Sequence, residues 1–195
     1  LNKNLMKNIK LLLMLTWVML FSVSCEVESY EENTLEATNA KASSDAGCET
    51  GFAICAANLS SCFIDDGFNR WGWTIGPMST SEHLFRMFTG AGQCDTSKGK
   101  LAVGVSIDYD SETGVAVIEY NAKEGYTLKE THLYIGNDPY PMQQRGKKLV
   151  PTVAPGQYPY KHGDLDGALS DTYTIEGLSG EIYMIAHAVV CKDGN

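Results

Sequence analysis

The feature that most constrains the fold is a series of short β-type segments from residue 84 to the C-terminus, separated by turn residues. These segments combine alternating apolar positions with β-branched and aromatic residues, which is the pattern of strands and not of helices. They comprise residues 100–108, 114–120, 126–135, 171–175 and 181–191. A polar run at 109–113 is typical of a hairpin connection. The pattern predicts an all-β fold, either an antiparallel β-sandwich or an open barrel.

The rest of the chain gives weaker signals. Only residues 51–63 and 79–87 suggest short helices, so we expect a short helical or irregular N-terminal segment before the strands. Residues 136–167 hold five of the six prolines, which predicts a long irregular stretch. Long loops of this kind are often functional.

The N-terminus has the organisation of an export signal. Lys3, Lys7 and Lys10 are the only charged residues before residue 26, and they precede an uncharged apolar stretch at 11–24. A basic start, a short apolar segment and small residues before a cleavage site are typical of a secretory signal. The stretch is shorter than the roughly 20 apolar residues of a membrane span. Residues 1–24 are therefore predicted to be a signal peptide.

The signal ends in a motif that resembles the lipobox of bacterial lipoproteins, in which a Cys is lipidated and becomes the new N-terminus. Here that residue is Cys25, preceded by Ser24, although Ser22 stands where Leu is usual. An ordinary signal peptide cleaved near Ser24 is the alternative, and it would leave a secreted protein. Acidic residues follow Cys25 at once and resemble the export tags of surface lipoproteins in the Bacteroidota.

Three regions therefore follow from the sequence. Residues 1–24 form the signal, 25–47 the lipidated Cys and a flexible acidic tether, and 48–195 a single β-rich domain. The tether has too few large apolar residues to offset the entropy cost of ordering it. We expect the protein to be exported and held in an outer membrane by lipid on Cys25, facing the cell surface or the periplasm.

Five cysteines follow Cys25: Cys48, Cys55, Cys62, Cys94 and Cys191. Exported chains use cysteines in disulfides, and an odd number predicts that one stays free or pairs between chains. In a helix, the first three would be spaced about 10 Å apart, too far for a disulfide. Cys94 and Cys191 are therefore the candidate partners, although the connectivity stays open. No C-x-x-C spacing supports a zinc site.

Charge excludes some partners. Once the signal is removed, all 24 acidic residues remain against 12 of the 15 basic ones, a formal charge of −12. We expect no nucleic-acid ligand, because phosphate binding needs clustered Lys and Arg. Docking to an anionic membrane surface is disfavoured for the same reason.

Histidines form the first candidate site. His132 and His187 lie in predicted strands, and His162 lies in the long irregular stretch. If the strands are neighbours, the imidazoles would converge and, with a carboxylate such as Asp164 or Glu130, would suit zinc, copper or iron. The alternative is that the strand histidines are half-buried and hydrogen-bonded.

Acidic turns form the second candidate site. Residues 108–112 carry alternate carboxylates, and so do Asp164 and Asp166. Calcium favours such oxygens, but neither segment completes an EF-hand loop, and turns use Asp on their own account. We expect no cofactor unless one of these two sites holds calcium or a transition metal.

Aromatic residues form the third candidate site. Trp71 and Trp73 are close in sequence, and Tyr140, Tyr158 and Tyr160 lie in the proline-rich stretch. Exposed rings near polar groups are typical of sugar-binding surfaces, because a ring stacks on the apolar face of a pyranose. Packing in the core is the alternative for the two tryptophans. Since no G-x-S-x-G, H-E-x-x-H or phosphate-binding glycine loop occurs, we do not predict an enzyme.

Five segments together resemble a β-rich extracytoplasmic domain that recurs in secreted and surface proteins of the Bacteroidota. They are NRWGWTIGP (69–77), GAGQCDTSKGK (90–100), ETHLYIG (130–136), TVAPGQYPYKH (152–162) and AHAVVC (186–191). The resemblance implies an extracytoplasmic location and a β-rich fold, without an established activity. We expect a lipoprotein binding module for glycan or another surface polymer. The alternatives are a structural or adhesive surface protein with a protein partner and a histidine-based metal-binding protein.

Overall fold

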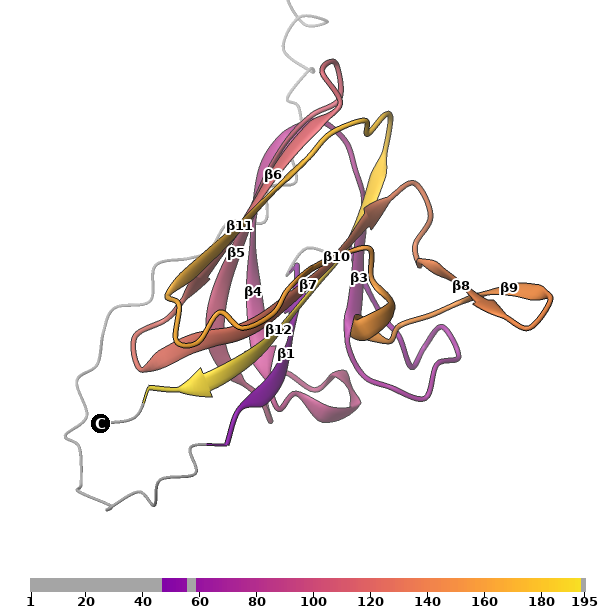
Figure 1. Ribbon diagram of the computed structural model, residues 1–195. Helices are drawn as coiled ribbons and strands as arrows, with labels where there is room; N and C mark the ends of the chain where they lie inside the picture. The colour runs from indigo at the N-terminus through magenta and orange to yellow at the C-terminus, as the bar shows by residue number, and fades with distance from the viewer. Residues whose placement is uncertain (1–46, 56–58, 194–195) are drawn as a thin grey trace, which may run out of the picture.

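The computed structural model describes residues 47–55 and 59–193, which form an all-β domain (Figure 1). The predicted all-β class is thereby confirmed. The predicted signal peptide, Cys25 and the tether up to residue 46 lie outside the described residues. Within the described part, no helix has the length and apolar character needed to cross a membrane.

The strands are β1 (Glu49–Ile54), β2 (Ser60–Cys62), β3 (Trp73–Met78), β4 (Ser81–Thr89), β5 (Lys100–Asp110), β6 (Val115–Ala122), β7 (Tyr126–Gly136), β8 (Met142–Arg145), β9 (Lys148–Pro151), β10 (Tyr160–His162), β11 (Ser170–Ile175) and β12 (Ile182–Lys192). Two 3₁₀ turns, η1 (Gly92–Cys94) and η2 (Pro155–Gln157), lie between them. The main antiparallel sheet runs β10-β7-β12-β1-β4-β5-β6-β11, with β3 on β12 and β2 on β3. β8 and β9 form a separate hairpin.

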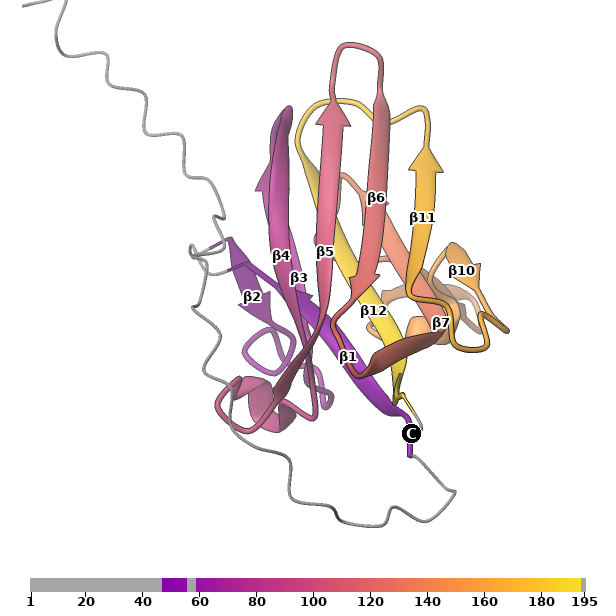
Figure 2. The same cartoon turned by 90° about the vertical axis from the view of Figure 1, so that its left-hand side faces the viewer.

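The main sheet curls until its two ends face each other (Figures 1 and 2). Thr131 of β7 is hydrogen-bonded to the side chains of Asp171 and Tyr173 in β11. The backbone before β11 also touches β7, where Leu128 and Ala168 form an isolated antiparallel bridge. Side chains and this single bridge join the ends, so the fold is an open barrel without a closing ladder.

Two apolar clusters lie on opposite faces of the sheet. Every second side chain of the main strands points inward, and these side chains fill the barrel; examples are Leu133, Ala186 and Met87. A smaller cluster covers the outer face of β1, β7 and β12 and contains Phe52, Phe63, Trp73, Ala91, Tyr134, Val153, Tyr158 and Ile185. The connecting segments 62–72, 90–95 and 152–158 therefore pack onto the outside of the barrel.

The suggested helices at 51–63 and 79–87 are wrong, because residues 51–54 lie in β1, 60–62 in β2 and 81–87 in β4. In β4, His83, Phe85 and Met87 are buried and alternate with more exposed residues. That period of two is the strand pattern, and the sheet on either side of β4 enforces it. The irregular stretch at 136–167 also contains more order than expected, since β8, β9 and β10 lie within it.

One disulfide joins the two ends of the described chain, and another joins two of the outer segments. Cys48 is bonded to Cys191, and Cys62 is bonded to Cys94, so the two predicted partners are confirmed. Cys55 is also disulfide-bonded, and no described cysteine is free. The expectation of a free thiol therefore fails for this part of the chain. Disulfides persist in oxidising compartments, which indicates an extracytoplasmic location.

Candidate functional site

A pocket opens where the outer segments meet the outer face of β1 and β12. It holds about 290 Å³. Phe52 of β1 and His187 of β12 contribute from the sheet, and the walls include Arg70, Trp71 and Gln93 from the outer segments. We call this hollow the outer-face pocket.

The sheet register places the two residues that the sheet contributes. Phe52 lies directly opposite His187 in the β1–β12 ladder, so both side chains point to the same face. Their ring centroids are 4.8 Å apart. Phe52 also meets Trp71 edge to face at 5.3 Å. Aromatic contacts therefore connect the sheet to the wall that carries Trp71.

Glycine at position 72 fixes the path of that wall. Gly72 has a φ of +139°, a conformation that side-chain-bearing residues rarely adopt. A Cβ at this position would lie 2.4 Å from the ring of Phe63 and 3.0 Å from that of Phe52. The chain thus passes close over two buried rings and delivers Trp71 and Arg70 to the pocket.

The Cys62–Cys94 disulfide joins two walls of the pocket. Cys62 begins the segment that carries Arg70 and Trp71, while Cys94 follows Gln93 directly. The Cys94 sulfur also lies 3.4 Å from the carbonyl oxygen of Gly72. The covalent link therefore fixes the separation of the two walls.

The pocket combines aromatic and polar groups and carries a positive charge. Asn69, Arg70 and Gln93 are exposed, Trp71 is half-buried, and no Asp or Glu of the described part of the chain lines the hollow. Among the described residues, no ion pair involves Arg70. Its guanidinium group retains donors for a planar or anionic ligand group.

Two histidines lie side by side beneath the pocket. His132 and His187 are paired across β7 and β12, and their Nδ1 atoms are 3.1 Å apart. A hydrogen bond between these two nitrogens requires a proton on one and a lone pair on the other. Nε2 of His132 lies 3.9 Å from a carboxylate oxygen of Glu130, which favours a proton on that nitrogen. In this arrangement the Nδ1–H group of His187 donates to Nδ1 of His132, and Nε2 of His187 carries a lone pair.

Burial keeps both rings neutral. It lowers the pKa of His187 to about 3, and the neighbouring His132 adds to this effect. Burial also lowers the pKa of His132, against the opposing influence of Glu130. The pair is therefore a neutral hydrogen-bonding group near pH 7.

The structure separates the predicted metal ligands. His162 lies on β10 and is paired with Thr131 of β7, the residue before His132. Because side chains alternate between the two faces of a sheet, His162 points to the face opposite that of His132. Its Nδ1 atom lies 2.9 Å from Asp171. In the described part of the chain, no group of three His, Cys, Asp or Glu side chains is placed to hold a metal ion. Of the predicted set, His132 and His187 come together, and Glu130 lies 3.9 Å from His132 on the side away from His187.

The acidic turns show local roles. Asp110 accepts hydrogen bonds from the backbone of Glu112 and from the hydroxyl of Thr113, as expected of a turn residue. Asp164 and Asp166 are exposed and have positive φ angles of 55° and 38°. They occupy tight turns before β11.

The predicted aromatic site is spread over the molecule. Trp71 lines the outer-face pocket, whereas Trp73 and Tyr158 are buried at 3% and 1% exposure. Tyr140 packs on Phe63 and Phe68 and donates to Asp66. Tyr160 lies at a different groove, between β10 and β11. Core packing thus accounts for Trp73 and Tyr158.

That groove is a wide, open hollow between the facing ends of the sheet. It holds about 360 Å³ and is lined by Tyr160, His162 and Tyr173, among others. The His162 ring stacks on the Tyr173 ring at 4.3 Å, and Asp171 binds both His162 and Thr131. His162, Asp171, Thr131 and Tyr173 thus bind one another, while Tyr160, Lys161, Thr172 and Thr174 also line the groove.

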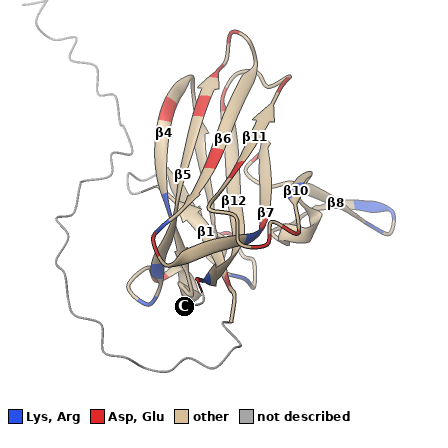
Figure 3. Cartoon of the chain, turned by 60° about the vertical axis from the view of Figure 1, so that its left-hand side comes forward, with Lys and Arg blue, Asp and Glu red and all other residues tan. Residues whose placement is uncertain are grey.

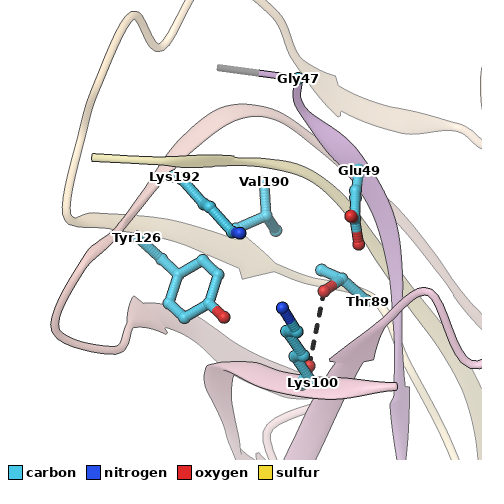
Figure 4. Close-up of a pocket in the computed structure, with 7 residues that line it drawn as sticks. All are labelled: Gly47, Glu49, Thr89, Lys100, Tyr126, Val190 and Lys192. Carbon is cyan, nitrogen blue, oxygen red and sulfur yellow. Dashed lines mark hydrogen bonds between the residues drawn. The ribbon is translucent and has the colours of Figure 1, made fainter. Parts of the chain in front are cut away.

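A third hollow lies near the Cys48–Cys191 disulfide (Figure 4). Glu49, Lys100, Tyr126 and Lys192 surround it. It holds about 10 Å³, roughly the space of one water molecule. It is too small for a sugar or a peptide side chain.

Sequence reasoning missed Phe52, Asn69, Arg70 and Gln93 as pocket residues. The only local signal was the position of Arg70 beside Trp71 in the segment 69–77. Four of the five segments that carry the family resemblance contribute to the pocket walls, and the fifth contains His132. No family model, curated protein or solved structure matches this chain.

Proposed function

We propose that the chain is an exported binding module that captures a glycan or another surface polymer in the outer-face pocket. One observation carries the proposal. The half-buried Trp71 ring, the buried Phe52 ring and the polar groups of Asn69, Arg70 and Gln93 surround one hollow of about 290 Å³. A hollow of this kind offers a ring for the apolar face of a pyranose and donors for its hydroxyl groups.

The binding role suits the rigidity of the site. The two walls are linked by the Cys62–Cys94 disulfide, and both pack against a buried aromatic cluster. A site that is formed before the ligand arrives loses less conformational entropy on binding. The neutral His132–His187 pair adds a fixed polar group to the pocket.

We further propose that the module is exported and is either held in an outer membrane by lipid on Cys25 or secreted. The lipobox-like motif and the acidic residues that follow it support the lipid anchor. Three acyl chains would anchor the protein more firmly than one chain. The resemblance to extracytoplasmic domains of the Bacteroidota agrees with it.

The test of the proposed function is a glycan array and affinity electrophoresis in polysaccharide gels with the mature protein. We expect retention on at least one polysaccharide, and Trp71→Ala should abolish it because the ring that stacks on the sugar is lost. Tyr160→Ala is the matched control, since Tyr160 lies at the groove between β10 and β11. Absence of retention on every polysaccharide, or equal loss in both variants, would refute the proposal.

A further inference from the structure

We infer that the ligand of the outer-face pocket is an anionic polysaccharide, whose sugars bear carboxylate or sulfate groups. This inference rests on the proposed function and narrows its ligand class. Two separate features support it: the positive charge of the pocket and the positive charge of the β8–β9 hairpin next to the pocket wall.

The pocket is electropositive within an acidic protein. The full chain has 24 acidic and 15 basic residues, yet among the described residues Arg70 lines the pocket and no carboxylate does. The unpaired guanidinium group of Arg70 can form two parallel hydrogen bonds with a planar carboxylate. Trp71, the next residue, contributes a half-buried ring to the same hollow. An acidic pyranose would satisfy both groups at once.

Two carboxylates in the neighbouring walls, Asp66 and Asp95, are engaged elsewhere. Asp66 accepts hydrogen bonds from Ser61 and Tyr140. Asp95, which follows η1, accepts from Ser97 and pairs with Lys98 at 3.2 Å. These contacts supply partners to the acids and leave Arg70 without one among the described residues.

The β8–β9 hairpin extends the positive charge beyond the pocket. Its tip carries Arg145, Lys147 and Lys148, all exposed, and Figure 3 shows this basic tip projecting from the domain. The base of the hairpin closes with a hydrogen bond from Thr152 to Pro141. The pocket residue Val153 follows Thr152 directly.

The hairpin and the pocket walls lie on the same side of the sheet (Figure 1). Four strand residues span roughly 13 Å, so the tip can reach acidic sugars that continue from the pocket along the same polymer. A short acidic oligosaccharide would fill the pocket alone, whereas a polymer would contact both regions. The two contributions are therefore separable by ligand length.

The experiment measures affinities of the mature protein by calorimetry at low and moderate salt. The probes are a short oligouronate, a polyuronate, its carboxyl-reduced neutral counterpart, a sulfated polysaccharide and a single-stranded DNA oligonucleotide. We expect the acidic sugars to bind at least about tenfold more tightly than the neutral one, in line with charge-assisted hydrogen bonds. The relative affinities of uronate and sulfate probes identify which anionic group is preferred.

Three variants separate the contributions. Arg70→Gln should remove the preference for acidic over neutral sugars. Replacing Arg145, Lys147 and Lys148 together by Gln should weaken polymer binding and its salt dependence but spare the short oligouronate. The matched control replaces Lys123, Lys129 and Lys192 by Gln, which changes the net charge equally away from the pocket and hairpin, and should leave both affinities unchanged.

The outcomes distinguish this inference from the proposed function. Equal affinity for neutral and acidic sugars would overturn the inference and leave a glycan-binding module. DNA binding as tight as polyuronate binding would also overturn it, because any polyanion would then serve. No binding of any sugar would refute the proposed function itself.

Discussion

His132 and His187 share a hydrogen bond between their Nδ1 atoms, 3.1 Å apart, across neighbouring strands. Because only one proton fits between the two nitrogens, the folded protein resists protonating both rings. His187 is almost fully buried, at 4% exposure, and one face of its ring contacts Phe52 in the pocket. The pair therefore links the acid sensitivity of the fold to the candidate site.

Acid should destabilise the fold through His187. The pKa of this ring falls from 6.5 to about 3 on folding, so the unfolded chain binds the proton more tightly. The stabilisation is complete above pH 6.5 and is lost as the pH falls toward 3. In denaturant titrations, the free energy of unfolding should fall by about 1.4 kcal/mol per pH unit from this group.

Comparison with His187→Gln removes that contribution together with the coupling of His187 to His132. In the variant, the free energy of unfolding should fall less steeply between pH 6.5 and 5, because Gln does not titrate. Burial also lowers the pKa of His83, but that contribution is common to both proteins and cancels. If the free energy of unfolding fell equally steeply with pH in both proteins, His187 would not be the source of the acid sensitivity.

Removing the Cys62–Cys94 disulfide should loosen the pocket. The two cysteines are 32 residues apart, and opening a loop of this size costs roughly 4 kcal/mol of stability in the chain-entropy model. Cys62→Ser with Cys94→Ser should lower both the melting temperature and the affinity for ligand. Cys48→Ser with Cys191→Ser should lower the melting temperature but spare ligand affinity, measured where both proteins are folded. Equal affinity losses would show that the link between the walls is unimportant for binding.

Gly72 should be intolerant of a side chain. Gly72→Ala combines an unfavourable φ with a contact of 2.4 Å to Phe63, and we expect a loss of about 2–4 kcal/mol in the free energy of unfolding. Gly67→Ala is the matched control, because Gly67 has a φ of +88° but no atom within 4 Å of the added Cβ. That variant should lose only about 1 kcal/mol. Similar losses would mean that backbone strain, and not crowding at Phe63, sets the cost.

The hydroxyl group of Tyr173 should stabilise the junction between the ends of the sheet. It lies 2.7 Å from Oγ1 of Thr131 and donates to the Thr131 carbonyl oxygen at 3.1 Å. Tyr173→Phe should cost about 1–3 kcal/mol, because buried polar groups of Thr131 lose a partner. Tyr183→Phe should be nearly neutral, since no described residue is hydrogen-bonded to the Tyr183 hydroxyl group. Thermal unfolding of both variants measures the difference.

Local patterns were sufficient for much of the fold. The strands from β5 to β7, β11 and β12 lie where alternation and turn residues predicted them, because period two and hairpin signals are properties of neighbouring residues. The candidate disulfide partners Cys94 and Cys191 were also correct, although the helical spacing from which they were inferred is not present. The misassigned segments were β1, β2 and β4, where short-range spacing was compatible with a helix and the neighbouring strands in the sheet imposed the strand.

The sequence by itself determined the β class, the disulfide-bonded character and the residue types from which a site could be built. Only the tertiary structure decided which of them meet. Phe52 and His187 face each other because the first and last strands pair in one register, and a shift of one residue would place them on opposite faces of the sheet. His162 is separated from His132 by that same alternation. Pairing between strands distant in sequence sets these positions, and local propensity carries no information about it.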